Sequence, residues 1–310
     1  MPELPEVETV RRGLAKFLPK SKIKDIQVLH PRVNRNGEER LESAVGAKIE
    51  SINRRGKYLW FSLDRGNAIV GHLGMSGQML IKSQNEPIST HVRAIIRFAG
   101  TSKEFRFIDQ RTFGWLTIDR LISTPTGEIP ELCRHIAQDP FDSKFNLDQS
   151  IQSLSQRKTQ IKRALLNQEI ISGIGNIYAD EALWYSRIHP ERKIESISQN
   201  ELRTLIRNAT KVMKNSLKRG GTSFDDLYID VNGQSGYYEV SLKAYGREGE
   251  PCKRCGTGIR RITFANRSSH FCPQCQRAPR RKSKVGKNRR ITDRSLDRRN
   301  DRGPHVQCLF

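Results

Sequence analysis

Four of the six cysteines stand at a spacing that predicts a metal site. Cys252 and Cys255 form one C-x-x-C pair, and after sixteen intervening residues Cys272 and Cys275 form a second. Two such pairs can surround one zinc ion with four thiolates, which leaves no open coordination position and makes the site structural. Two independent redox motifs are the alternative, but the regular pairing argues against them. We therefore predict one structural zinc, with the other two cysteines outside it.

The segment between the two cysteine pairs predicts a hairpin suited to a DNA groove. It carries three arginines, Arg260, Arg261 and Arg267, and the aromatic Phe264 among small polar residues. Basic side chains can neutralise phosphates, while an aromatic or polar side chain can reach into a groove.

The N-terminus, MPELPEVE, offers a second kind of chemistry. Removal of Met1 would leave Pro2 as a secondary amine with the α-amino pKa of roughly 7.7–8.0, so part of it is unprotonated at neutral pH. Such an amine can attack the anomeric carbon of a deoxyribose and form an iminium ion, an electron sink for phosphate elimination. Glu3 could move protons during base loss. On the residues alone, a proline-led helix start with acids in its first turn is favoured.

Two kinds of secondary structure must position these groups. Leu4, Val7, Val10 and Leu14 recur at helical spacing, so a helix begins almost at residue 1. Short apolar and β-branched runs then predict a two-sheet sandwich or barrel. The predicted strands are Ala47–Ile52, Tyr58–Leu63, Ala68–Leu73, Gln78–Ile81, Ala94–Phe98, Phe105–Ile108 and Trp115–Ile118.

From about residue 140 the pattern becomes helical. We predict helices at Leu147–Ser155, Thr159–Leu166, Ile177–Tyr185 and about 198–217. The connection 170–178 holds two glycines and an asparagine between helices, which predicts a tight turn with exposed backbone amides.

Composition points to a nucleic-acid partner. The 310 residues include 55 Lys and Arg against 33 Asp and Glu, a net charge of +22. Residues 281–310 contribute +7 with little apolar content and are predicted to be disordered, so +15 remains on the rest. An anionic membrane surface is the competing partner, but the chain has no long apolar run and no basic-then-apolar signal pattern. We therefore expect a soluble, cytoplasmic protein that binds nucleic acid.

Six motifs resemble bacterial formamidopyrimidine-DNA glycosylase and occur in the family's order over residues 1 to about 280. They are MPELPEVETVRRGL at the N-terminus, GKYLWF at 56–61, DQRTFG at 109–114, SGIGNIYADEALW at 172–184, YGREGEPCKRCG at 245–256 and NRSSHFCPQCQR at 266–277.

The resemblance implies an α+β multidomain fold. Residues 1–133 would form an N-terminal β-sandwich with a leading helix. Residues 134–240 would form a helix–two-turns–helix domain, with a lesion-capping loop at 222–237. A β-hairpin zinc finger would span 241–280, and a disordered basic tail 281–310.

The resemblance also implies a bifunctional glycosylase and abasic-site lyase of base excision repair, acting as a monomer on double-stranded DNA with oxidised purines or abasic sites. Pro2 would form the Schiff base and Glu3 would be the general acid, with Glu6 in the same pocket. Lys57 would donate a proton in β-elimination and contact a phosphate. Arg267 would grip the phosphates around the flipped nucleotide and assist δ-elimination.

Further DNA contacts follow from the same resemblance. Asn176 and the amides of its turn would clamp a phosphate. Arg157 and Lys162, on the preceding basic helix, and His91, at a strand start, match DNA-binding positions. A solvated helix face is the alternative for the first two, and a structural histidine for the third.

A flipped nucleotide leaves a gap in the duplex that some side chain must fill. The resemblance assigns this role to Met75, Arg111 and Phe113. A methionine or a phenylalanine at such a position otherwise indicates core packing. The family often has Asp-Pro-Arg-Arg-Phe-Gly where this chain has Asp109-Gln-Arg-Thr-Phe-Gly, so the arginine and phenylalanine are kept. This departure leaves the preference for the opposite base open.

Two rival functions remain. Endonuclease VIII-type enzymes of the same superfamily act on oxidised pyrimidines, but Pro-Glu-Leu-Pro-Glu, Met75 and the Arg-x-Phe pair favour the purine enzyme. A non-catalytic zinc-finger DNA-binding protein would not need Pro2, Glu3 and Lys57 together.

The composition of residues 281–310 generates a prediction about salt. A chain that ends at Arg280 lacks a net charge of +7 relative to the full chain. A plot of log K for DNA binding against log salt concentration should therefore be shallower for the short chain, with a slope smaller by up to about 6. Its single-turnover excision at low salt should match that of the full chain. Equal salt slopes for the two proteins would instead mean that the tail serves solubility.

Overall fold

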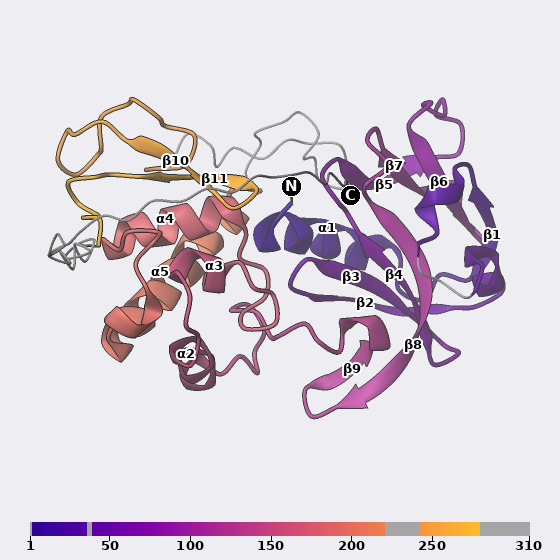
Figure 1. Cartoon of the computed structure of the whole chain (residues 1–310). Coiled ribbons are helices and arrows are strands. Elements are labelled where there is room, and N and C mark those ends of the chain that lie inside the picture. The colour runs from indigo at the N-terminus through magenta and orange to yellow at the C-terminus, as the bar shows by residue number, and fades with distance from the viewer. Residues whose placement is uncertain (1, 36–38, 221–241, 280–310) are drawn as a thin grey trace, which may run out of the picture. The chain divides into compact units, whose positions relative to one another are not determined.

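The computed structural model describes residues 2–35, 39–220 and 242–279 (Figure 1). The predicted capping loop 222–237 and basic tail 281–310 lie outside the described residues. The described N-terminal, helical and finger segments belong to one compact unit that ends at Pro279.

A helix begins almost at the N-terminus, as predicted. Helix α1 spans Leu4–Phe17, with Pro5 in its first turn and Glu3 as its N-cap residue. Leu4, Val7 and Leu14 are at most 1% exposed. Helix α1 packs against β2 and β3 of the sandwich on one side and against α5 of the helical part on the other, so it joins the two.

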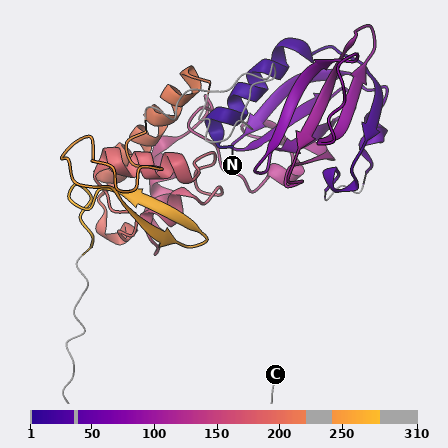
Figure 2. The same cartoon turned by 90° about the horizontal axis from the view of Figure 1, so that it is seen from above.

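The first part of the chain is an antiparallel β-sandwich (Figure 2). One sheet has the order β1-β6-β7-β5 and the other β2-β3-β4-β8-β9. Alternate side chains of both sheets meet in one core, where the rings of Phe61 and Phe105 lie edge to face at 5.4 Å. The strands are β1 Ile23–Val28, β2 Ile49–Arg55, β3 Tyr58–Leu63, β4 Asn67–His72, β5 Gly77–Ser83, β6 Val92–Phe98, β7 Lys103–Asp109, β8 Trp115–Thr124 and β9 Gly127–Pro130.

All seven predicted strands are present, but two further strands were missed. Strand β1 reads IKDIQV, and its irregular register between Ile23 and Asp25 breaks the alternation of apolar and polar residues. Strand β9 reads GEIP, and glycine and proline normally indicate a turn. It forms because it lies at the edge of its sheet and pairs only with β8.

The helical part follows the predicted pattern closely. Its helices are α2 Leu147–Ser155, α3 Ile161–Leu165, α4 Asn176–Ser186 and α5 Gln199–Lys218. Helix α3 is shorter than predicted because Thr159 and Gln160 pair with the chain at residues 193–194 instead. Short 3₁₀ turns lie at Pro31–Val33, Leu41–Ala44, Glu131–Cys133 and Ile194–Ser196.

Helix α4 is the centre of the helical part. Every side chain from Ile177 to Trp184 is buried, because α5 covers one side and the finger strand β11 another. The finger itself is the predicted hairpin, with β10 at Arg260–Phe264 paired in register with β11 at Arg267–Phe271. Figure 2 shows the hairpin lying along α4. No helix of the described residues is long and apolar enough to cross a membrane.

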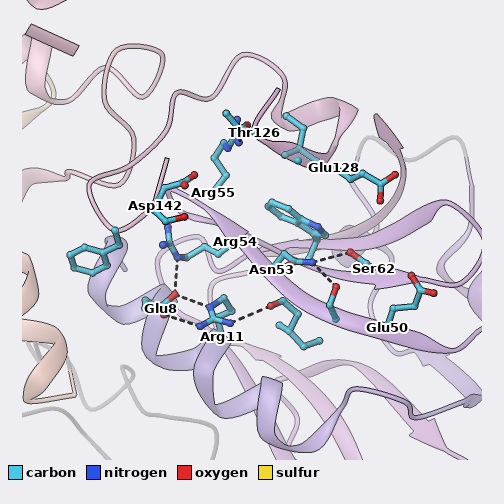
Figure 3. A pocket seen from close by; sticks show the side chains of 17 residues that line it. Glu8, Arg11, Glu50, Asn53, Arg54, Arg55, Ser62, Thr126, Glu128 and Asp142 are labelled. Carbon is cyan, nitrogen blue, oxygen red and sulfur yellow. Dashed lines mark hydrogen bonds and ion pairs between the residues drawn. The ribbon is translucent and has the colours of Figure 1, made fainter. Parts of the chain in front are cut away.

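A buried ion-pair network ties α1 and β2 to the chain that leads into the helical part (Figure 3). Arg54 donates to Glu8 at 3.0 Å and to Asp139 at 2.6 Å, and its side chain is only 7% exposed. Asp139 also accepts the amide of Gly56 at 3.0 Å. Hydrogen bonds from Arg11 and Arg12, with the charge of Arg54, outweigh burial and lower the pKa of Glu8 to about 2.

This network borders a polar cavity on the far side of the five-stranded sheet from the main core. Arg11, Arg54, Arg55 and Asn53 line it together with the tip of the β8–β9 hairpin. Arg55 donates to the hydroxyl of Thr126 at 2.7 Å, so the hairpin tip is fixed to β2.

Loss of the Asp139 carboxylate should destabilise the protein strongly. Asp139→Ala removes one of the two carboxylates that pair with the buried Arg54 guanidinium and leaves only Glu8. The free energy of unfolding, measured with urea at pH 7, should therefore fall by about 3–5 kcal/mol. Asp142→Ala, a half-buried carboxylate in the same segment, is the matched control and should cost less than about 1 kcal/mol. Similar costs for the two variants would contradict a special role for the Arg54 network.

Candidate active site

The carboxylate of Glu3 is held by the N-terminus of α4. It accepts the backbone amides of Gly175 at 2.7 Å, Ile177 at 2.9 Å and Tyr178 at 3.4 Å. These amides have no partner inside the helix, and the helix dipole favours an anion there. Glu3 is thus hydrogen-bonded to Tyr178, which lies 175 positions further along the chain.

Glycines make this close approach possible. A Cβ on Gly175 would lie 2.3 Å from Cδ of Glu3, and one on Gly173 would lie 2.8 Å from Cβ of Leu4. Gly173 also has φ +88 and accepts the amide of Leu4 at 3.1 Å. The predicted tight turn therefore exists, but its amides are not exposed as predicted: they are buried and donate to the protein's own Glu3.

Glu6 lies in the same pocket as Glu3, as predicted. It accepts the amide of Glu3 at 2.9 Å and the hydroxyl of Tyr178 at 2.7 Å. The same hydroxyl lies 2.6 Å from the hydroxyl of Ser216 on α5. Burial, followed by the charges of Glu6 and Glu3, raises the pKa of Tyr178 well above its ordinary value, so it stays a neutral donor.

Pro2 and Lys57 are buried beside these carboxylates. Lys57 begins the turn into β3, and its neighbour Gly56 packs so tightly that a Cβ there would lie 2.7 Å from Ser172. Burial lowers the pKa of Lys57 despite the charge of Glu3, and burial raises the pKa of Glu3 despite the charge of Lys57. Both pKa values therefore move toward neutral pH, which suits groups that exchange protons with a substrate.

The zinc-finger hairpin brings Arg267 to this site. The exposed Arg267 is the first residue of β11, and its charge contributes to the lowered pKa of both Lys57 and Lys162. The structure therefore brings together residues from the N-terminus, the β2–β3 turn, the α4 turn and the finger.

Lys162 has a different setting from the one expected of a DNA contact. Its side chain is 0% exposed, and its ammonium lies 2.6 Å from Asp180 and donates to the carbonyl of Ser268 at 2.9 Å. Asp180 also accepts the hydroxyl of Ser269 and the amide of His270, each at 2.8 Å. In this arrangement Lys162 holds β11 against α4, and a DNA contact by this residue stays a prediction.

Of the other predicted DNA contacts, Asn176 is bonded to the finger and Arg157 is exposed to solvent. Asn176 is the first residue of α4 and donates to the carbonyl of Ser268 at 3.1 Å, so it also supports the finger strand next to Arg267. Arg157 is exposed just after α2, where a phosphate could reach it. His91 is half-buried before β6, and its carbonyl accepts the amide of Asp109.

The three predicted gap-filling residues lie on two loops. Met75 is 41% exposed between β4 and β5, while Phe113 is 49% exposed and Arg111 is exposed between β7 and β8. Neither apolar side chain is in the core, which was the alternative expectation for these residue types.

The four predicted cysteines form one cluster. Their sulfur atoms all lie within 4.8 Å of one another. A tetrahedral zinc with bonds of about 2.3 Å needs sulfurs about 3.8 Å apart, so the set fits one ion with no open position. The indole of Trp184 on α4 donates to the sulfur of Cys252 at 3.3 Å, which anchors the metal site to the helical part.

Three buried residues that hold the site together were not predicted from the sequence: Asp180, Glu181 and Tyr178. All three lie on α4 and bind the finger, the chain that enters it, or Glu6. Glu181 accepts the amides of residues 243–245 at 2.8–3.0 Å and so fixes the chain that enters the finger. A signal existed: two adjacent acids stand inside the apolar run IYADEALW, where a buried carboxylate needs donors from a neighbouring segment.

Comparison with protein families gives three matches in chain order. The formamidopyrimidine-DNA glycosylase N-terminal domain matches residues 1–116, the formamidopyrimidine-DNA glycosylase H2TH domain matches 136–227, and the zinc finger found in FPG and IleRS matches 249–278. Together with the sandwich, the helical part and the cysteine cluster, they define a zinc-finger DNA glycosylase.

Relatives identify the family. Formamidopyrimidine-DNA glycosylase of a Nocardioides species is 48% identical over 94% of this chain and all of its own length, and that of Thermobifida fusca is 48% identical over 90% and 99%. Fpg of Lactococcus lactis with abasic-site DNA matches at a TM-score of 0.77 and 32% identity, over 89% of this chain and all of that one. A MutM complex with carbocyclic 8-oxo-G DNA matches equally well, at 33% identity. The chain belongs to the formamidopyrimidine-DNA glycosylase family.

The zinc finger should hold one metal ion per chain. Cys272→Ser removes a fully buried ligand and should abolish stoichiometric zinc, disorder the hairpin that carries Arg267, and weaken both DNA binding and cleavage by at least about tenfold. Elemental analysis and a cleavage assay measure this, with Cys308→Ser as the control. Active protein without zinc would contradict the assignment.

Proposed function

We propose that this protein is a bifunctional DNA glycosylase and abasic-site lyase of base excision repair, which removes 8-oxoguanine and formamidopyrimidines. The observation that carries the proposal is that Pro2, Glu3, Lys57 and Arg267 meet from three segments, the first three buried and Arg267 exposed beside them. A DNA-binding protein without catalysis would gain nothing from burying two carboxylates and a lysine at such cost.

Each group has a defined task in the proposed reaction. The nitrogen of Pro2 bonds to C1′ of the damaged nucleotide, the C1′–base bond breaks, and the base leaves with a proton. Glu3 supplies a proton during base loss, since its raised pKa keeps it protonated to higher pH than an ordinary glutamate.

The iminium then serves as the electron sink for strand cleavage. Loss of a C2′ proton expels the 3′ phosphate, and a second elimination expels the 5′ phosphate. Lys57 is the proton donor for the first elimination, and Arg267 neutralises the phosphates. Hydrolysis of the remaining Schiff base returns Pro2.

The surrounding residues support a flipped-nucleotide complex. Arg111, Met75 and Phe113 would fill the gap in the duplex, while Arg157 and His91 would bind phosphates. A phosphate contact by the Asn176 side chain would require its amide to leave the Ser268 carbonyl, and the neighbouring amides already donate to Glu3. Contacts of Lys162 with DNA would require it to leave Asp180. The finger and the net charge of +22 suit a partner that is double-stranded DNA with oxidised purines or abasic sites, bound by a monomer in the cytoplasm.

Pro2 is the residue whose change tests the proposal most directly. Pro2→Gly, or retention of Met1, should abolish the borohydride-trapped adduct on a duplex with 8-oxoguanine opposite cytosine. A retained Met1 converts the proline nitrogen into an amide, and glycine lacks the ring that presets the amine. DNA affinity should change less than about twofold, since phosphate contacts are untouched.

The control is Pro87→Gly, at an exposed position before β6, which should trap like the unchanged protein. Mass spectrometry must establish the N-terminus of each protein. An adduct from protein that retains Met1 would refute the Schiff base. Cleavage of oxidised pyrimidines in preference to 8-oxoguanine would favour the endonuclease VIII-type function.

A further inference from the structure

The two loops that carry Met75, Arg111 and Phe113 both cross between the sheets of the sandwich. One leads from His72, the end of β4, to Gly77, the start of β5, and the other leads from Asp109, the end of β7, to Trp115, the start of β8. His72 pairs with Trp115 in the five-stranded sheet and Gly77 pairs with Asp109 in the four-stranded sheet. The loops therefore start and end side by side.

A single buried carboxylate joins these loops. Asp109 is 0% exposed. One of its oxygens accepts the hydroxyl of Ser76 from the first loop and the amide of Arg111 from the second, the latter at 3.1 Å. The other oxygen accepts the amide of Gly114 at 2.6 Å. The Ser76 oxygen also accepts the Arg111 amide at 3.2 Å, which closes a ring of bonds between the loops.

The loop backbones are in close contact as well. A Cβ on Gly74, which has φ +61, would lie 2.5 Å from the backbone of Phe113 and Gly114. Thr112, between the two exposed side chains of its loop, has φ +54, a conformation that a β-branched residue rarely adopts. Such a conformation persists only where neighbouring bonds impose it, and Asp109 bonds the amides on both sides of Thr112.

The Asp109 carboxylate has no ion-pair partner among the described residues. Arg93 donates at 2.7 Å to the backbone carbonyl of Asp109 instead. A buried carboxylate satisfied by amides and a hydroxyl fixes backbone geometry rather than balancing a charge. An apolar or neutral residue would fill the same space in the sandwich at a smaller cost in desolvation free energy.

We propose that Asp109 is a positioning residue that makes the Met75 loop and the Arg111–Phe113 loop act as one rigid wedge, with Ser76 as the link between them. The inference rests on the proposed function, in which these side chains fill the gap left by a flipped nucleotide. A preset wedge avoids the entropy cost of ordering two loops when the base leaves the stack.

The test uses the full chain with two variants of different severity. Ser76→Ala removes only the link between the loops, and Asp109→Asn keeps the shape but sets an amide N–H against a loop amide. Asp119→Asn is the control, because Asp119 lies on β8 away from both loops and its carboxylate also accepts a backbone amide, that of Leu132. Urea unfolding of each protein shows whether the sandwich is intact.

Single-turnover excision of 8-oxoguanine from duplex DNA should fall about tenfold or more in Asp109→Asn and about threefold or more in Ser76→Ala. Cleavage at a preformed abasic site, which has no base to unstack, should change less than about twofold. Fluorescence of 2-aminopurine beside the lesion should show slower base extrusion.

A double-mutant cycle separates a wedge role from general stability. In a Phe113→Ala background Ser76→Ala should have little further effect on extrusion, because the wedge is already lost. Additive losses, or unchanged extrusion in Ser76→Ala and Asp109→Asn while Phe113→Ala is slow, would overturn the inference alone. Unchanged extrusion in Met75→Ala and Phe113→Ala would overturn the proposed wedge itself, and the inference with it.

Discussion

The contact on which the rest of this structure depends is the bond between Glu3 and the first amides of α4. It places a carboxyl group at the positive end of a helix, and three amides donate to it. The same contact fixes the N-terminal segment against the helical part, because Leu4 belongs to the helical core rather than to the sandwich core. A change in the angle between sandwich and helices would therefore displace the Glu3 carboxylate directly.

Around this contact, buried charges come in satisfied groups. Glu8, Arg54 and Asp139 join α1 and β2 to the following segment, and Lys162 and Asp180 join the finger strand to α4. Each group crosses a boundary between parts of the fold. Burying such charges costs free energy, but their bonds are directional and fix one relative placement, which apolar contacts alone do not. The site needs that placement because its four catalytic candidates come from three segments: the N-terminus, the β2–β3 turn and the finger.

Much of this architecture could be predicted from the sequence. The sandwich strands, the helices, the finger hairpin and the four-cysteine site follow from alternation, helical spacing and paired cysteines, and the family follows from the motifs. The edge strands β1 and β9 could not be predicted, because a bulge breaks the pattern of one and Gly and Pro stand in the other. Their partners in space, and not their own residues, make them strands.

The roles of charged residues were harder to predict than their positions. Lys162 lies in a run of basic residues, and nothing in its neighbours along the chain indicates that Asp180, eighteen positions on, takes its charge in the interior. In the same way, Asp109 was read only as part of a motif, although its carboxylate organises both loops beside it. Long-range partners decide whether a charge faces solvent, and a sequence pattern holds no such information.

The separation in sequence between Glu3 and its amides has a consequence for how the enzyme is made. During synthesis the N-terminal residues leave the ribosome first, and the sandwich can fold before α4 exists. The Glu3 carboxylate stays without its three donors until Tyr178 has emerged, and Arg267 emerges 89 residues after Tyr178. A nascent or truncated chain therefore exposes Pro2 and Glu3 without the amides and the arginine that surround them, and the site is assembled only after the finger has been synthesised.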